Sequence, residues 1–250
     1  MYVALVTAYV VLTIMVLIVL LMVLGVHLSN SLRWAMLIGW IAVCGSGIFF
    51  VERFIAPVWP PYRRPIRSEE ERLTALMEDV QSRVGSQMRV RFLIHGDDKK
   101  ATGSIGFRTV VVQSGSLLEA SDGEFQGILA HELGHLRDGD RVLEAAFVTA
   151  GFLAQAFRLA CRAMRKSFMI SPVAGLFLSV ILSPLLIGLL IFFLLDVVFR
   201  AVLWCLRPWI EYRQDCLAFR AGFGNGLRAW LERTGLAVHV RRIRRLEKMK

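Results

Sequence analysis

The stretch from Tyr2 to Leu24 contains 23 residues and no charged side chain. As an α-helix it would measure about 34 Å, which is enough to cross the hydrocarbon core of a bilayer. A cleaved signal peptide would show a basic start, a shorter apolar core and a cleavage site of small residues, and the stretch shows none of these. It therefore predicts a retained transmembrane helix. The chain is 56% hydrophobic and only 20% charged, which favours a membrane-embedded protein over a soluble one.

Three further apolar stretches suit membrane helices. Trp34–Val51 follows the first stretch closely, so the two are expected to form a hairpin. Val142–Phe157 is weaker because Glu144 and Gln155 interrupt it, whereas Val173–Leu195 is again free of charge over 23 residues. The hydropathy pattern therefore predicts a mainly α membrane protein with about four transmembrane helices.

Basic residues predict how these helices are oriented. The second stretch is followed by Arg53, Arg63, Arg64 and Arg67. The positive-inside rule therefore places the region after it in the cytoplasm. From Arg200 onward, twelve Lys and Arg face four Asp and Glu, so +8 of the net charge of +10 lies in the last 51 residues. Such a basic tail suits anionic lipids. We expect no nucleic acid as a partner, because no nucleic-acid-binding motif accompanies the charge.

One basic cluster argues against the chain crossing the membrane twice between residues 142 and 206. The cluster lies between the third and fourth apolar stretches and contains Arg158, Arg162, Arg165 and Lys166. Two crossings would place it on the outer side, against the charge rule. We still favour two crossings, because Val173–Leu195 is hard to leave outside the membrane.

The region between residues 52 and 141 has the patterns of a small α+β domain. Ser68 with Glu71 predicts a capping box at the start of a helix, and Gly85 suits its C-terminal end. Alternation and capping signals also predict two strands and one more helix. These are strands at Met88–Ile94 and Ile105–Gln113, and a helix at Glu124–Leu136 capped by Ser121 or Asp122.

The helix expected at Glu124–Leu136 contains an H-E-x-x-H pattern formed by His131, Glu132 and His135. Residues four apart share a helix face, so both imidazoles can reach one metal ion while Glu132 deprotonates a water molecule beside it. Two imidazoles and a carboxylate suit Zn(2+), which lowers the pKa of bound water to about 7. The alternative is a helix end with two solvated histidines. The pattern lies on a capped amphipathic helix, however, which is the setting that the metal chemistry needs, so this alternative is disfavoured.

A zinc site requires a third protein ligand. Glu211 and Asp215 follow the last apolar stretch and share one helix face. Glu211 can supply the third ligand, and Asp215 can accept a hydrogen bond from the outer nitrogen of a ligand histidine. The alternative is an ordinary polar face beside the membrane, which the H-E-x-x-H pattern disfavours. The sequence therefore predicts one Zn(2+) per chain.

In motif and in order, the sequence resembles the HtpX-type membrane zinc metallopeptidases, relatives of the CAAX prenyl proteases. Two N-terminal spans precede a cytoplasmic H-E-L-G-H, and Gly139-Asp140 resembles the family's N-G-D. More apolar helix follows, and then Glu211-x-x-x-Asp215. The likeness covers most of residues 1–220.

This resemblance implies specific roles for the site residues. Zinc would be bound by His131, His135 and Glu211. Glu132 would act as general base and then as general acid. Asp215 would hydrogen-bond a ligand histidine, most simply His131, and Asp140 would support the site.

The sequence departs from the family's pattern in two places. Family members often have an N-A-x-A edge strand that pairs with the substrate backbone. The corresponding substrate-binding residues lack the Asn and are Ala101, Thr102, Gly103 and Ser104. The C-terminal H-P…R-I…L pattern of the family is matched only loosely, by His239, Ile243 and Leu246. The residue that stabilises the oxyanion therefore stays open among Tyr212, Arg213 and His239.

Together these patterns predict a membrane-embedded, zinc-dependent endopeptidase with a small cytoplasmic α+β, gluzincin-like catalytic domain. It would be a multi-pass inner-membrane protein that cleaves membrane or membrane-associated proteins. An intramembrane site-two-type protease is disfavoured because charged residues flank the motif, and CAAX prenyl proteases need more spans. The remaining alternative is a non-catalytic membrane scaffold that keeps the fold and does not need Glu132. The expected segments are a transmembrane hairpin (1–51), a catalytic region (52–141), C-terminal transmembrane helices (142–206), and a segment with the third ligand and basic tail (207–250).

Overall fold

The computed structural model describes residues 2–23, 29–50, 52–53, 62–96, 102–234 and 240–248. The chain divides into two compact units. Unit 1 comprises Met1–Gly47 and Leu143–Leu206, and unit 2 comprises Ile48–Val142 and Arg207–Lys250. The described chain is mainly helical, which confirms that part of the predicted fold class.

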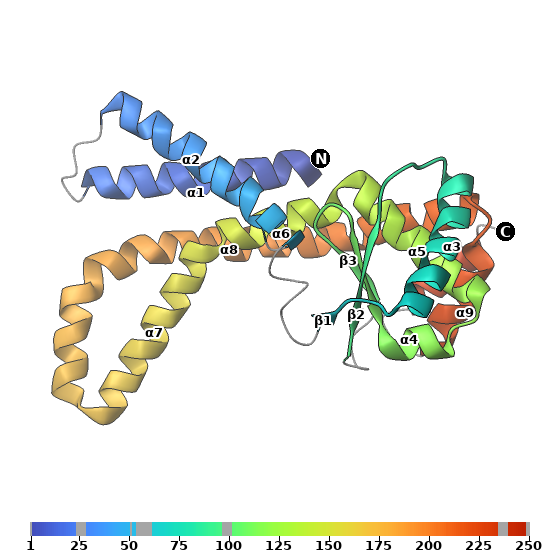
Figure 1. Ribbon diagram of the computed structural model, residues 1–250. Helices are drawn as coiled ribbons and strands as arrows, with labels where there is room; N and C mark the ends of the chain where they lie inside the picture. The colour runs from blue at the N-terminus through green and yellow to red at the C-terminus, as the bar shows by residue number, and fades with distance from the viewer. Residues whose placement is uncertain are drawn as a thin grey trace. The chain divides into compact units, whose positions relative to one another are not determined.

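Unit 1 is built from helices alone in its described part. Figure 1 shows α1 and α2 side by side, and the indole of Trp40 on α2 donates a hydrogen bond to Thr13 on α1 over 3.3 Å. The helices that contribute to the unit are α1 (Tyr2–Val23), α2 (Asn30–Phe50), α6 (Asp140–Ala150), α7 (Phe152–Ile170) and α8 (Pro172–Arg220), of which the last continues into unit 2.

Helix α8 carries the clearest membrane signal. Within the residues described, the stretch Leu189–Arg220 is long and apolar enough to cross a bilayer. The apolar stretch Val173–Leu195 forms the first part of α8, which runs on to Arg220. The number of crossings, expected to be about four, stays a prediction.

The stretch Val142–Phe157 is divided between two helices. Helix α6 ends at Ala150 and α7 begins at Phe152, so Gly151 separates them. Glycine loses the most backbone entropy in a helix, which makes it a natural point for this division. Gly151 thus interrupts the weakest of the four apolar stretches, and whether this stretch crosses the membrane stays a prediction.

A fully buried carboxylate links three helices within unit 1. Asp196 on α8 accepts hydrogen bonds from the Tyr9 hydroxyl at 3.2 Å, from Arg158 at 2.8 Å and from Arg200 at 2.7 Å. Asp196 and Arg200 are four residues apart on one helix, a spacing at which side chains of opposite charge can pair. Arg158 belongs to the basic cluster that two crossings would place on the outer side, against the positive-inside rule. It forms an ion pair with Asp196, a buried carboxylate that needs a partner of opposite charge.

Unit 2 contains a four-stranded sheet in the order β1-β2-β4-β3. Strands β2 and β4 are parallel, whereas β1 pairs with β2 and β3 pairs with β4 in the antiparallel sense. The strands are β1 (Tyr62–Arg63), β2 (Arg91–His95), β3 (Gly103–Ile105) and β4 (Thr109–Gln113).

The strand expected over Ile105–Gln113 is in fact the end of one strand, a turn and a second strand. Gly106 has a φ of +62°, a left-handed conformation that lets the chain reverse between β3 and β4. Alternation alone could not reveal this turn, because Val110, Val111 and Val112 are all buried on a strand that is covered on both faces. Strand β3 thereby becomes an edge of the sheet.

The helices of unit 2 begin close to where the sequence predicts. Helix α5 is capped by Ser121 in a capping box with Glu124, as expected. Helix α3 begins at Arg67, one residue before the expected cap Ser68, because the Glu69 carboxylate accepts the backbone N–H of Ile66 over 2.9 Å. The helices wholly within the unit are α3 (Arg67–Val84), α4 (Ser114–Glu119), α5 (Asp122–Asp138), α9 (Gly224–Thr234) and α10 (Val240–Glu247).

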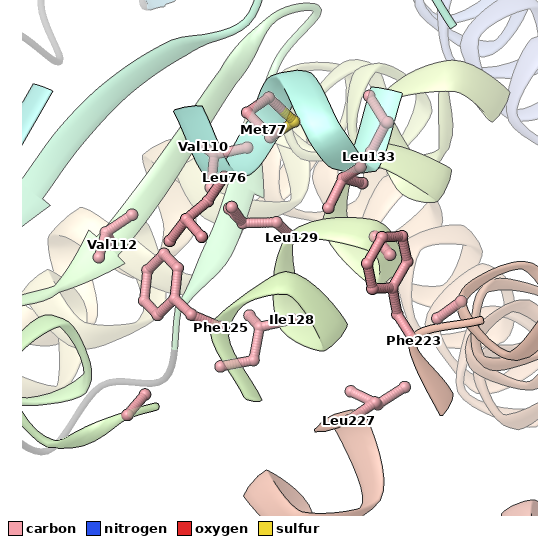
Figure 2. Packing of buried hydrophobic residues seen from close by; sticks show 14 of the residues in the cluster. Leu76, Met77, Val110, Val112, Phe125, Ile128, Leu129, Leu133, Phe223 and Leu227 are labelled. Atoms are coloured by element: carbon pink, nitrogen blue, oxygen red, sulfur yellow. The ribbon is translucent and has the colours of Figure 1, made fainter. Parts of the chain in front are cut away.

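Helix α5 lies at the centre of the core of unit 2 (Figure 2). Leu129 and Leu133 on α5 are fully buried, with Met77 of α3 and Phe223 in the same apolar cluster. The helix that carries the H-E-x-x-H pattern is therefore fixed by packing along most of its length, and its histidines occupy the buried part.

Candidate metal centre

Two helices of unit 2 bring three metal-binding side chains together. His131 and His135 lie on α5 and Glu211 on α8, and one ligand atom from each lies within 4.8 Å of the others. The Nε2 atom of His131 is 3.3 Å from Glu211 Oε2, and that of His135 is 3.8 Å from Glu211 Oε1. The structure therefore places the sequence-predicted third ligand against both histidines.

Each histidine is oriented by a separate carboxylate. His131 Nδ1 is 3.0 Å from Asp215 Oδ1, and His135 Nδ1 is 3.2 Å from Asp140 Oδ2. In a neutral ring, a proton on Nδ1 donated to the carboxylate would leave the lone pair on Nε2 free for a metal ion. Asp215 thus contacts the histidine that the sequence indicated, and Asp140 performs the same task for the other ring.

The chemistry of this cluster fits a metal ion. His135 Nε2 is buried and has no hydrogen-bond partner within the described structure, although a buried polar atom left unpaired costs about 1–3 kcal/mol. Two imidazole nitrogens and one carboxylate oxygen are a typical donor set for catalytic zinc, which leaves a further coordination position open. A cation between these atoms would give the orphaned nitrogen its partner.

The carboxylates also set the ionisation of their partners. Burial alone would lower the pKa of His131, but its hydrogen bonds to Asp215 and Glu211 outweigh burial and raise the pKa to about 9. Burial would raise the pKa of Asp140, but the hydrogen bonds from His135 and Gln214 and the charge of Arg213 hold the pKa below its usual range. The metal-free site therefore favours a protonated His131 beside ionised carboxylates.

Arg242 is a site residue that the sequence analysis did not identify. It lies on α10, where its Nε donates to Asp215 Oδ2 over 3.0 Å and its Nη1 is 3.3 Å from Glu211 Oε2. Its Nη2 lies 3.3 Å from His131 Nδ1. The available signal was the loosely matched R-I…L pattern, since Arg242 directly precedes Ile243.

The residues beside Glu211 support Asp140. Gln214, fully buried, donates to Asp140 over 2.9 Å, and Arg213 donates to the same carboxylate over 3.1 Å. Gly134 has no room for a side chain, because a Cβ there would collide with the amide of Gln214. The glycine of the H-E-L-G-H motif is thus needed for the close approach of α8 to α5.

The three oxyanion candidates fare differently. Arg213 forms ion pairs with Asp138 at 2.9 Å and with Asp140 at 3.1 Å, so two carboxylates already neutralise its charge. Tyr212 is exposed and stacks with the guanidinium of Arg245, whose centre is 5.7 Å from the ring. His239 lies outside the described residues. The structure therefore selects none of the three.

Glu132 directly follows His131 on α5 and contacts the edge strand β3. Its carboxylate is buried and accepts a hydrogen bond from Ser104 on β3 over 2.7 Å. Arg141 lies 3.9 Å from the same carboxylate and donates to the Ser104 hydroxyl over 3.3 Å. One predicted substrate-binding residue therefore touches the predicted general base.

Two of the other predicted substrate-binding residues lie on or directly before the same strand. Gly103 lies on β3 opposite Val111 of β4. The Thr102 hydroxyl accepts the backbone N–H of Gln113 over 3.3 Å and so closes the open end of the hairpin. Ala101 lies outside the described residues.

Comparison with known families agrees with this site. The sequence profile of peptidase family M48 matches residues 68–226, which is more than half of the chain. The chain belongs to peptidase family M48. The matched range contains both histidines of the motif, Glu132 and Glu211. The resemblance to HtpX-type metallopeptidases is thereby confirmed at the level of the family.

Solved structures offer a distant likeness. The crystal structure of S. mikatae Ste24p matches with 15% sequence identity and a TM-score of 0.49. The match covers 85% of this chain and 52% of the other, so the chain spans about half the length of that protein. No curated protein matches the chain significantly.

Proposed function

We propose that this M48 protein is a membrane-embedded, zinc-dependent endopeptidase. The observation that carries the proposal is the convergence of His131, His135 and Glu211, with one nitrogen left unpaired, beside the buried carboxylate of Glu132. The two histidines and the base lie on α5 and the third metal-binding residue lies on α8, and together they supply the metal site and the base that metal-assisted peptide hydrolysis requires.

The residues divide the chemistry as follows. His131, His135 and Glu211 would hold Zn(2+), and the bound metal would supply Lewis-acid chemistry for water and the peptide carbonyl. Glu132 removes the proton from the attacking water and returns it to the leaving nitrogen. Ser104 donates to Oε2 of Glu132 and so holds the carboxylate in place, leaving Oε1 for the proton. Asp215 and Asp140 keep the two rings oriented.

Strand β3 is the proposed docking element for the substrate. It is an edge strand, and an extended peptide can pair with an edge by β-augmentation, which brings its backbone to the catalytic groups. Ser104 on this strand already contacts Glu132, so a peptide aligned there lies beside the base. Substrates are proposed to be membrane or membrane-associated proteins, because the chain itself carries an apolar helix that can cross a bilayer.

The remaining expectations concern location. Positive residues after the second apolar stretch support an inner-membrane protein with its catalytic site in the cytoplasm. The basic C-terminal segment is proposed to contact anionic lipids of that leaflet.

The proposal is tested with two variants purified in detergent. Glu132→Gln should keep about one zinc per chain and lose peptide cleavage, because the amide cannot accept the proton. Glu211→Ala should lose most of the zinc, because only two protein ligands remain. Glu70→Gln, on the exposed face of α3, is the matched control and should retain both properties.

Two results would contradict the proposal. Equal cleavage by the wild type and Glu132→Gln would remove the assigned base. A wild type that holds no zinc after zinc is supplied, and cleaves no peptide, would favour the non-catalytic scaffold.

A further inference from the structure

Glu52 makes an unusual set of contacts for a residue just beyond an apolar helix. It follows the last residue of α2, Phe50, by two positions and is 7% exposed. Its carboxylate accepts the backbone N–H groups of Phe107 and Arg108 and the hydroxyl of Thr109, each over 2.8 Å. All three donors come from the β3–β4 turn and the first residue of β4.

The turn is shaped to receive this carboxylate. Gly106 has a φ of +62°, and a Cβ placed there would lie 2.5 Å from Glu52 Oε2. A side chain at this position would be excluded by both the backbone conformation and the close approach. Thr109 is 2% exposed, so no water can readily replace the carboxylate as the acceptor of its hydroxyl.

The same hairpin carries the edge strand of the site. Ser104, which donates to Glu132 over 2.7 Å, precedes Gly106 by two residues on β3. Two residues of strand span about 7 Å, so the anchored turn lies close to the contact with the base. Short edge strands have few hydrogen bonds of their own, and β3 has three residues with a single neighbouring strand. An anchor at its turn therefore fixes much of its position.

We infer that Glu52 is a positioning residue that sets the register of the peptide-binding strand β3 against Glu132. This inference rests on the proposed function and deepens it. The hydrogen bonds of Glu52 in the described structure go to Phe107, Arg108 and Thr109, and none goes to the metal-binding residues or to Glu132. It holds the turn, the turn places β3, and β3 decides which peptide bond of an extended substrate lies beside the base.

The first test compares the wild type with Glu52→Ala on an extended peptide that carries several cleavable bonds. Glu52→Ala leaves three donors of the turn without their acceptor, so KM should rise about tenfold or more. The value of kcat should change less than KM, because the metal ligands and Glu132 remain on α5 and α8. Mass spectrometry of the products should show that cleavage spreads from one bond to its neighbours, and zinc content should stay at the wild-type level.

A second pair of variants guards against a general folding defect. Thr109→Val removes one of the three donors while keeping the shape of the side chain, and Thr109→Ser keeps the hydroxyl. Thr109→Val should move KM and the cleavage pattern in the same direction as Glu52→Ala, by about threefold. Thr109→Ser should restore wild-type values. Hydrogen exchange of the Phe107 and Arg108 amides should be faster in Glu52→Ala than in the wild type. This measurement tests the anchor independently of any activity assay.

The outcomes separate this inference from the proposed function. If the wild type holds zinc but cleaves no peptide, the proposed function fails. If the wild type cleaves, and Glu52→Ala cuts the same single bond with an unchanged KM, the register role of Glu52 is overturned. If Glu52→Ala loses zinc, the Thr109 pair decides, and equal behaviour of Thr109→Val and Thr109→Ser overturns the inference.

Discussion

Replacing Asp215 with asparagine should weaken zinc binding without removing a ligand. The amide has the size of the carboxylate, and its oxygen can still accept the proton on His131 Nδ1. The negative charge is lost, however, from a residue that is fully buried and lies 3.0 Å from that nitrogen. The imidazole then gives less electron density to a bound cation. Arg242, which pairs with both Asp215 and Glu211 in the structure, keeps only Glu211 as an ionised partner.

The magnitude follows from the contacts. Removing a group that orients a metal-bound histidine typically costs 10- to 100-fold in metal affinity, which is about 1.4–2.7 kcal/mol. We expect Asp215→Asn near the upper end, because Arg242, whose side chain is only 16% exposed, then has Glu211 as its one remaining ionised partner beside the metal position. Asp140→Asn should fall near the lower end. Gln214 still holds the side chain in place, and the Arg213 side chain is 40% exposed and keeps Asp138.

The assay is zinc competition against a chromophoric chelator at fixed pH with detergent-purified protein. Asp138→Asn is the matched control, because Asp138 binds the same Arg213 and Gln214 but contacts neither histidine in any recorded interaction. It should bind zinc within about twofold of the wild type. Wild-type affinity in Asp215→Asn, or an equal loss in Asp138→Asn, would refute the assignment of the two orienting carboxylates.

Two further predictions concern protons and the buried charge of unit 1. Zinc binds neutral imidazole, and the pKa of His131 in the metal-free protein is raised to about 9. Protonated His131 therefore competes more strongly as the pH falls below 9, and the apparent zinc affinity measured by the same competition should drop by up to about tenfold from pH 8 to pH 7. An affinity that does not change over this range would contradict the assigned protonation. Asp196→Ala should destabilise unit 1 by about 2 kcal/mol, because Arg158 and Arg200 lose their shared partner, although both are partly exposed. Thermal unfolding in detergent measures this loss, and an unchanged midpoint would show that the cluster does not hold the helices together.

Much of the site could be predicted because its signals are local. The H-E-x-x-H spacing places two imidazoles on one face of a helix whatever surrounds it, and Ser121 with Glu124 marks where that helix begins. Glu211 and Asp215 share a face for the same reason. The pairing of Asp196 with Arg200 also lies within one helix, at a spacing of four.

The failures arose where a local signal was weak or a non-local contact competed with it. Helix α3 starts at Arg67 because the Glu69 carboxylate accepts the N–H of Ile66. From the sequence, Ser68 with Glu71 is an equally good start, so the sequence could not distinguish the two. The turn at Gly106 was missed because β4 is apolar on both faces, so the chain shows no alternation there. Arg242 was missed because the R-I…L pattern that contains it is matched only loosely, and because it lies in a tail rich in basic residues.

The sequence alone determined the capped helix that carries the H-E-x-x-H pattern, the apolar stretches and the types of residue available for a metal site, because each depends on neighbours within one or two turns of the chain. Only the tertiary structure decided that Asp140 serves His135, that Arg242 lies over Asp215 and Glu211, and that Glu52 holds a turn 55 residues away. These contacts join segments whose spacing along the chain carries no regular period. They exist because packing of α5 against the sheet, α8 and α9 leaves buried polar groups that must find partners, and the folded chain supplies them from wherever it passes.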